Sequence, residues 1–200
     1  MGVRFGTPHG DAERLAQAGV EHVARTARLK TAGGAALTTT ATEQVSLTSP
    51  HEMRHVRLDA LTERRPLDDS EQTGWRYLVE AGGAPVAAAE VATDAGGGGA
   101  AFSQLNEGPF VQSTAEALRT LEERPETAAG NYEVRMARVP ALYVMALWLE
   151  DLDGDEDLVL PLAPAPAFLD TQRLYSEQEF LDALAGPARE RLAFDDTPQE

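Results

Sequence analysis

Apolar and polar residues alternate along several short stretches of the chain, and the period of that alternation predicts strands. Trp75 to Glu80 is rich in aromatic and β-branched residues, and a second candidate strand, Val86 to Val91, follows the turn residues Gly82-Gly83-Ala84-Pro85. Two strands separated by a glycine-rich turn predict a β-hairpin. The tract Gly96 to Gly99 is too permissive in backbone conformation to lie inside an element, so we expect a flexible loop there.

A second hairpin is predicted further along the chain. Apolar positions in Tyr132 to Met136 alternate with polar ones, which is the period of a half-buried strand, and Pro140 ends it. The apolar run Ala141 to Leu149 has no period of its own, but its length and its Tyr, Val and Trp content favour a strand buried on both faces. We expect residues 157–162 to pair with this strand across an acidic turn.

Two helices are predicted in the first two thirds of the chain. Asp11 suits the N-cap of a weakly amphipathic, basic helix over residues 11–30. Ser113 and Glu116 have the spacing of a capping box, in which each side chain bonds the other residue's backbone N–H. This spacing predicts a helix that starts at Ser113 and is limited by Pro125.

The clearest helix signal lies near the C-terminal end. Ser176 and Glu179 form another capping box, and Tyr175 and Phe180 have the spacing of a hydrophobic staple. Gly186-Pro187 predicts the end of this helix, because proline cannot donate a backbone hydrogen bond inside one.

Strands that arrive in hairpins, with helices between and after them, predict an α+β fold with an antiparallel sheet and helices packed on one face. Residues 31–50 are dominated by Thr, Ala, Gly and Ser, which have little to bury and predict a loop or tether. We therefore divide the chain into an N-terminal helical arm with its tether, residues 1–50, and an acidic α+β domain, residues 51–200.

Composition narrows the classes of function. The 200 residues carry 33 acidic and 17 basic groups, a net charge of −16, which disfavours proteins that mainly bind nucleic acid or anionic membranes. The absence of cysteine excludes disulfides, thiolate metal sites and a cysteine nucleophile. Abundant Ala and Arg with no Ile indicate a GC-rich bacterial genome. Because no run is apolar enough to span a bilayer and no secretory signal pattern is present, we expect a cytoplasmic protein.

The charge is unevenly distributed along the chain. Residues 1–65 hold nine basic and seven acidic groups, a net charge of +2, whereas residues 66–200 have a net charge of −18. The basic N-terminal helix could lie on its own acidic domain, or it could dock on a partner. Both alternatives stay open at this point.

The most specific match to a catalytic pattern is His51-Glu52-Met53-Arg54-His55, which spells H-E-x-x-H. On a helix, His51 and His55 would share one face and could bind a zinc ion while Glu52 activates a metal-bound water. Pro50 weakens this interpretation, because it would put His51 at the frayed start of such a helix. The third zinc ligand would have to come from a carboxylate that the sequence does not identify.

The same segment is also compatible with a strand. Val56, Leu58 and Ala60 alternate with polar residues, and in a strand His51 and His55 would stand roughly 13 Å apart, too far to share an ion. The histidines are then ordinary loop or surface residues.

A dense group of carboxylates lies in Glu150 to Asp157, which we call the acidic turn. Its carboxylates are Glu150, Asp151, Asp153, Asp155, Glu156 and Asp157. The alternation of Asp151, Asp153 and Asp155 resembles the first half of a calcium loop, but Leu162 stands where such a loop needs a bidentate glutamate. The segment therefore predicts a solvated turn, weak calcium binding, or a contact for an arginine-rich partner.

These observations favour a non-enzymatic bacterial accessory protein that binds another, basic protein through the six carboxylates of the acidic turn. Such a protein could be a component of a larger assembly or an inhibitor. The alternative is a zinc-dependent hydrolase that uses His51, Glu52 and His55. The sequence leaves the partner's identity and the oligomeric state open, and we expect no membrane or nucleic-acid partner.

Overall fold

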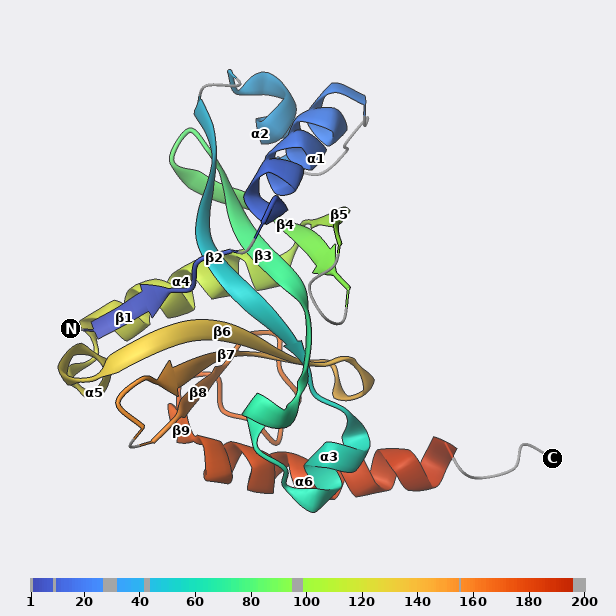
Figure 1. The fold of residues 1–200 in the computed structure, drawn as a ribbon, viewed down its shortest axis with the longest axis vertical. Coiled ribbons are helices and arrows are strands. Elements are labelled where there is room, and N and C mark those ends of the chain that lie inside the picture. The colour runs from blue at the N-terminus through green and yellow to red at the C-terminus, as the bar shows by residue number, and fades with distance from the viewer. Residues whose placement is uncertain are drawn as a thin grey trace.

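The computed structural model describes residues 2–8, 10–26, 32–41, 44–94, 99–154 and 156–195 (Figure 1). The strands are β1 (Gly2–Phe5), β2 (Val45–His55), β3 (Glu71–Ala81), β4 (Ala84–Thr93), β5 (Ala100–Asn106), β6 (Asn131–Val139), β7 (Val144–Asp151), β8 (Leu158–Pro161) and β9 (Tyr175–Ser176). The α-helices are α1 (Ala12–Thr26), α2 (Ala32–Thr39), α3 (Leu58–Glu63), α4 (Pro109–Glu123), α5 (Pro125–Ala129) and α6 (Glu177–Asp195). Two short 3₁₀ turns are η2 (Leu67–Asp69) and η3 (Pro140–Leu142).

All the described strands form one twisted sheet, and the expected α+β class is confirmed. The strand order is β5-β4-β3-β2-β6-β7-β8-β9, and β1 pairs with β6 outside this path. Most pairs are antiparallel, but β6 pairs in parallel with β1 along its first half and with β2 along its second half. The sheet is therefore mixed, which local hairpin signals could not indicate because both parallel pairs join distant segments.

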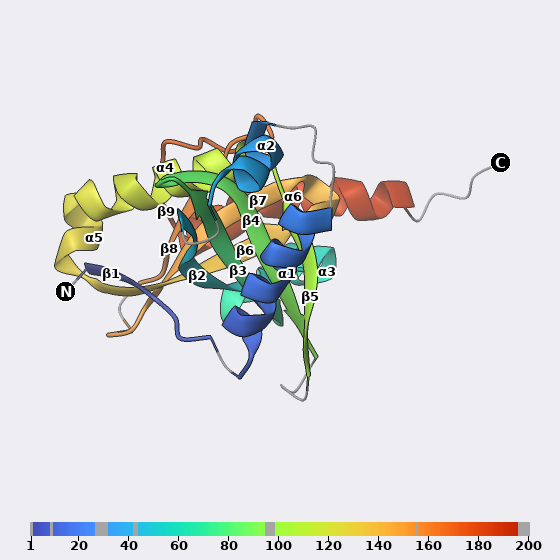
Figure 2. The same ribbon diagram turned by 90° about the horizontal axis from the view of Figure 1, so that it is seen from above.

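Helices cover both faces of this sheet, whereas the sequence predicted them on one. Leu147 and Leu149 of β7 pack with α4, while Ala146 and Trp148 point the other way and pack with α6. Trp148 lies in register across the sheet with Arg135, Glu52 and Trp75, so these four side chains point to the same face. Trp148 packs with α6 and Trp75 packs with α1, and both helices therefore cover this face. Figure 2 shows α1 and α4 on opposite sides of the strands. Between α1 and α6, the shared face carries charged side chains.

The expected tether over residues 31–50 is wrong. Within that range α2 and the first six residues of β2 are regular structure, and the boundary drawn after residue 50 falls inside β2. Small residues favour close packing here rather than a loop: a Cβ added at Gly33 would lie 2.4 Å from the carbonyl oxygen of Val86. Leu37 is buried in the same cluster as α1 and β3. Small side chains thus let α2 approach the sheet closely.

Both predicted hairpins are confirmed. The β3–β4 hairpin turns at Gly82 and Gly83, whose φ angles of 60° and 79° favour glycine. The hairpin of β7 and β8 joins Leu149 to Leu158 across the acidic turn. The flexible loop predicted at Gly96 to Gly99 lies largely outside the described residues. The helix predicted over residues 11–30 is described as far as Thr26, and residues 27–30 lie outside the described ranges.

Helix boundaries were predicted less well. The helix expected to start at Ser113 begins at Pro109, because proline suits the first turn, so Ser113 lies inside α4. The capping box at Ser176 is confirmed: Ser176 N donates to Glu179 Oε2 at 3.1 Å, and Glu179 N donates to Ser176 Oγ at 3.3 Å. However, α6 continues through Pro187 to Asp195.

Burial explains why α6 continues beyond the predicted stop. Leu184 and Ala185 before Pro187, and Ala188 after it, are almost fully buried. The burial of residues on both sides of the proline offsets the hydrogen bond that it removes.

The strand expected over Ala141 to Leu149 begins only at Val144. Pro140 to Leu142 form a 3₁₀ turn, and Tyr143 adopts a left-handed conformation with φ 55° while remaining 84% exposed. From Val144 onward the strand is buried on both faces, as predicted. The continuous apolar run therefore spans a turn as well as a strand.

Candidate functional site

The H-E-x-x-H segment lies in strand β2, so the helical arrangement proposed for zinc is wrong. Ser49 has φ 50°, and the register with β3 shifts between Thr48 and His51, which accommodates Pro50 as an irregularity in the strand. The strand ends at His55, and residues 58–63 form α3 instead of continuing the alternation. Two histidines four residues apart in a strand stand roughly 13 Å apart.

His51 is part of a buried polar network under α4. Its Nδ1 lies 2.7 Å from the carbonyl oxygen of Ser49, so Nδ1 donates and Nε2 is left to accept from Arg76, 3.4 Å away. Arg76 also donates to Thr114 at 3.2 Å and pairs with Glu90 at 3.7 Å. Burial, followed by the charge of Arg76, lowers the pKa of His51 to about 3. His51 is therefore a neutral, buried residue that hydrogen-bonds within the sheet.

Among the described residues, no group of three or more His, Asp or Glu side chains is placed to hold a metal ion. Glu52, the base expected in the zinc alternative, instead pairs with Arg54. Asp155, the third candidate calcium ligand beside Asp151 and Asp153, lies outside the described residues.

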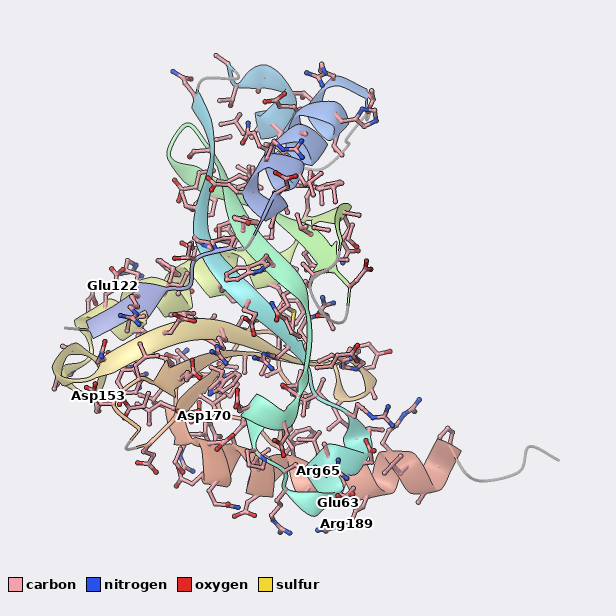
Figure 3. All side chains as sticks on the ribbon, in the orientation of Figure 1. Glu63, Arg65, Glu122, Asp153, Asp170 and Arg189 are labelled. Atoms are coloured by element: carbon pink, nitrogen blue, oxygen red, sulfur yellow. The ribbon has the colours of Figure 1, made fainter. Side chains whose placement is uncertain are left out.

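Carboxylates of the acidic turn accept hydrogen bonds from backbone N–H groups of the same turn. Asp151 accepts hydrogen bonds from the backbone N–H groups of Asp153 at 2.9 Å and Glu156 at 3.1 Å. Asp157 accepts from the backbone of Asp151 at 2.8 Å and from the indole N–H of Trp148 at 2.7 Å. These bonds fix the path of the turn. Asp153 and Glu156 remain exposed, and Asp153 lies at the outer end of the hairpin (Figure 3).

Beside this turn, three carboxylates surround Arg135 on the face between α1 and α6, and two more lie close enough to interact with them electrostatically. We call Asp68, Glu133, Glu150, Asp157 and Glu177 the carboxylate cluster. Arg135 lies 2.5 Å from Glu150, 3.4 Å from Asp68 and 3.8 Å from Glu133, and its guanidinium stacks 5.0 Å above the ring of Trp148.

Arg54 is the second cation of this region, and it is shared between the cluster and Glu52. It lies 3.9 Å from Asp68 and is also paired with Glu52. Asp157 and Glu177 repel each other electrostatically. Asp157 also repels Glu150, and Asp68 also repels Glu177. Within the described part of the chain, the cluster therefore holds more carboxylates than the cations in contact with it can neutralise.

The pKa values of two cluster residues reflect this imbalance. Burial raises the pKa of Glu150, Arg135 lowers it, and the neighbouring charges of Glu133, Asp157 and Asp68 raise it further. Burial likewise raises the pKa of Glu177, whose carboxylate accepts a 2.5 Å hydrogen bond from the backbone N–H of Leu67. Carboxylates with raised pKa values occur both at functional sites and in structural ion-pair networks.

The structure thus unites part of the predicted site with residues that the sequence analysis missed. Glu150 and Asp157 belong to both the acidic turn and the carboxylate cluster. The charged alternation of Glu133 and Arg135 in β6 could have indicated a polar strand face. Asp68 and Glu177 gave no signal, because they reach the cluster through tertiary packing of η2 and α6.

No family model, curated protein or solved structure matches this chain. None of the helices in the described ranges combines the length and the apolar character that crossing a bilayer requires.

Proposed function

We propose that this chain is a non-enzymatic, cytoplasmic bacterial protein that binds a basic protein through the acidic turn and the adjoining carboxylate cluster. It would act as a component of a larger assembly or as an inhibitor. The observation that carries the proposal is the surplus of carboxylates around Arg135, next to a turn that exposes Asp153 and Glu156.

The internal hydrogen bonds of the turn support this proposal. Because the carboxylate of Asp151 holds the backbone N–H groups of Asp153 and Glu156, the backbone positions of these two exposed residues are set before a partner arrives. A binding surface that is already ordered loses less conformational entropy on association. Glycine at position 154, with φ 83°, permits the tight path of the turn.

The electrostatics of the cluster support the same partner chemistry. Burial raises the pKa of Glu150, and the neighbouring carboxylates raise it further against the opposing effect of Arg135, so both burial and repulsion disfavour its charged form. A lysine or arginine from another protein would relieve this repulsion. Charges at the rim of an interface mainly steer association and choose the partner, and their effect weakens with salt.

Binding of a capped nona-arginine peptide, followed by fluorescence anisotropy at 50 and 300 mM NaCl, tests the proposal. The variant Asp153→Asn/Glu156→Gln should raise the Kd at least fivefold at low salt. The matched control Glu116→Gln/Glu190→Gln removes the same charge from the exposed surfaces of α4 and α6 and should change the Kd less than twofold. Equal effects of the two double variants would show that only net charge matters and would refute the assigned surface.

A further inference from the structure

Strand β1 is an edge of the sheet. Among the strands that the structure describes, it pairs only with β6, over Gly2 to Phe5, and the part of β2 before Glu52 is not paired with β6. In a strand with one neighbour, alternate backbone N–H and C=O groups point away from that neighbour. Among the described residues, no hydrogen bond satisfies the outward groups of β1. This edge can accept another strand.

A groove lies beside β1. Its volume is about 490 Å³, and it lies between β1 and the segment where α4 passes into α5. Its lining consists of Gly2, Val3, Arg4, Leu121, Glu122, Thr127, Ala128 and Asn131. The wall is partly apolar, so it can receive the side chains of an extended segment that point to one face of the sheet.

The groove adjoins the acidic turn. Asn131 lines the groove, and its side-chain amide donates to Asp153 Oδ1 at 3.1 Å. Figure 3 shows Glu122 and Asp153 at the same end of the molecule, with β1 and β6 between them. Arg4 lies two residues further along the strand. The end of the groove next to Gly2 is therefore bordered by carboxylates, which suit a basic occupant.

We propose that β1 and this groove bind an extended, basic segment of the partner protein, which adds to the sheet as a further strand. The proposal rests on the function proposed above and specifies its mode: backbone hydrogen bonds to β1 provide the attachment, and Glu122 and Asp153 select basic side chains near Gly2. Strand addition of this kind takes affinity from the main chain and specificity from alternate side chains.

Three peptides of equal charge distinguish strand addition from simple charge attraction. The first is a capped hexapeptide of alternating Lys and Val. The other two have the same sequence with N-methyl groups on every second amide, one peptide for each edge of the extended chain. The unmethylated peptide should bind with a Kd at least tenfold lower than one of the methylated forms, measured by calorimetry with the full chain.

Variants of the full chain locate the binding site. Ala128 is exposed and lines the groove, so Ala128→Trp should fill the groove and raise the Kd of the unmethylated peptide at least tenfold without lowering the Tm. Glu122→Lys should raise it at least threefold, whereas Glu190→Lys, the same change on the exposed side of α6, should change it less than twofold.

The outcomes separate this inference from the proposed function. If every peptide binds equally, and binding depends on Asp153 and Glu156 but not on Ala128, the acidic surface stands and strand addition is refuted. If binding depends on Ala128 and on the unmethylated amides but not on Asp153 and Glu156, the edge site stands without the acidic turn. If no peptide binds, both are refuted. Self-association that Ala128→Trp abolishes would make a second copy the occupant and overturn the basic-peptide assignment.

Discussion

The carboxylate of Asp157 accepts a hydrogen bond from the indole nitrogen of Trp148 at 2.7 Å, and so connects the acidic turn to the largest fully buried side chain of the sheet. The same carboxylate also receives the backbone N–H of Asp151. Asp157, which the sequence predicted to contact a partner, therefore also stabilises the fold.

Replacing Asp157 should destabilise the protein. Asp157→Ala leaves the buried indole N–H of Trp148 without its acceptor, which costs about 2 kcal/mol of unfolding free energy. Urea unfolding followed by tryptophan fluorescence measures the loss. Asp153→Ala, which removes a neighbouring exposed carboxylate, should cost less than about 0.5 kcal/mol. A stability of Asp157→Ala equal to that of the unmodified chain would contradict the structural role of this bond.

His51 should make the stability depend on pH. Its pKa falls from about 6.5 in the unfolded chain to about 3 in the folded protein, so the unfolded chain binds the proton first as the pH falls. The neutral histidine therefore supports the fold fully above pH 6.5, and its contribution is lost progressively towards pH 3. The expected slope approaches roughly 1.4 kcal/mol per pH unit.

The variant His51→Asn isolates this contribution. Between about pH 6.5 and 5 the unfolding free energy of the unmodified chain should fall more steeply than that of the variant, because an asparagine side chain does not titrate. Parallel pH profiles for the two proteins would show that His51 is accessible to protons in the folded state.

The two capping-box patterns should respond differently to the same substitution. Ser176→Ala removes the acceptor of the Glu179 N–H and should lower the unfolding free energy by about 1 kcal/mol. Ser113→Ala is the matched control, because Ser113 lies inside α4 and its hydroxyl has no hydrogen-bond partner in the described structure. Thermal unfolding of the two variants should therefore differ, and equal losses would argue that α4 starts at Ser113.

Tyr143 occupies a backbone conformation that favours glycine. Because its side chain is 84% exposed, Tyr143→Gly removes little packing and relieves a left-handed φ of 55°. We expect the variant to gain about 0.5 to 1 kcal/mol in unfolding free energy, seen as a higher Tm. A lower Tm would mean that the tyrosine ring contributes packing that its exposure does not indicate.

Local patterns predicted the elements that depend on neighbouring residues. The turn at Gly82 and Gly83 and the box of Ser176 and Glu179 are set by residues within a few positions of each other, and both formed as expected. The Ser113 pattern failed because Pro109 offers an earlier start to the same helix. A local signal can therefore identify a helix while misplacing its first residue.

The candidate site was only partly predictable for a related reason. The carboxylates of the acidic turn are consecutive in sequence, so their density was visible at once. Arg135 and Asp68 are far apart along the chain and meet only because β6 lies beside β2 in the sheet and η2 packs against it. Which carboxylates are neutralised and which remain exposed could not be inferred without those contacts.

The sequence by itself determined the α+β class, both hairpins and the negative charge of the chain, because these follow from the spacing of apolar residues, from turn chemistry and from composition. Only the tertiary structure decided that His51 and His55 lie in a strand, that α6 passes through Pro187, and that β1 is left as an edge of the sheet. Each of these outcomes depends on packing between distant segments, whose burial outweighs the local preference of the residues involved.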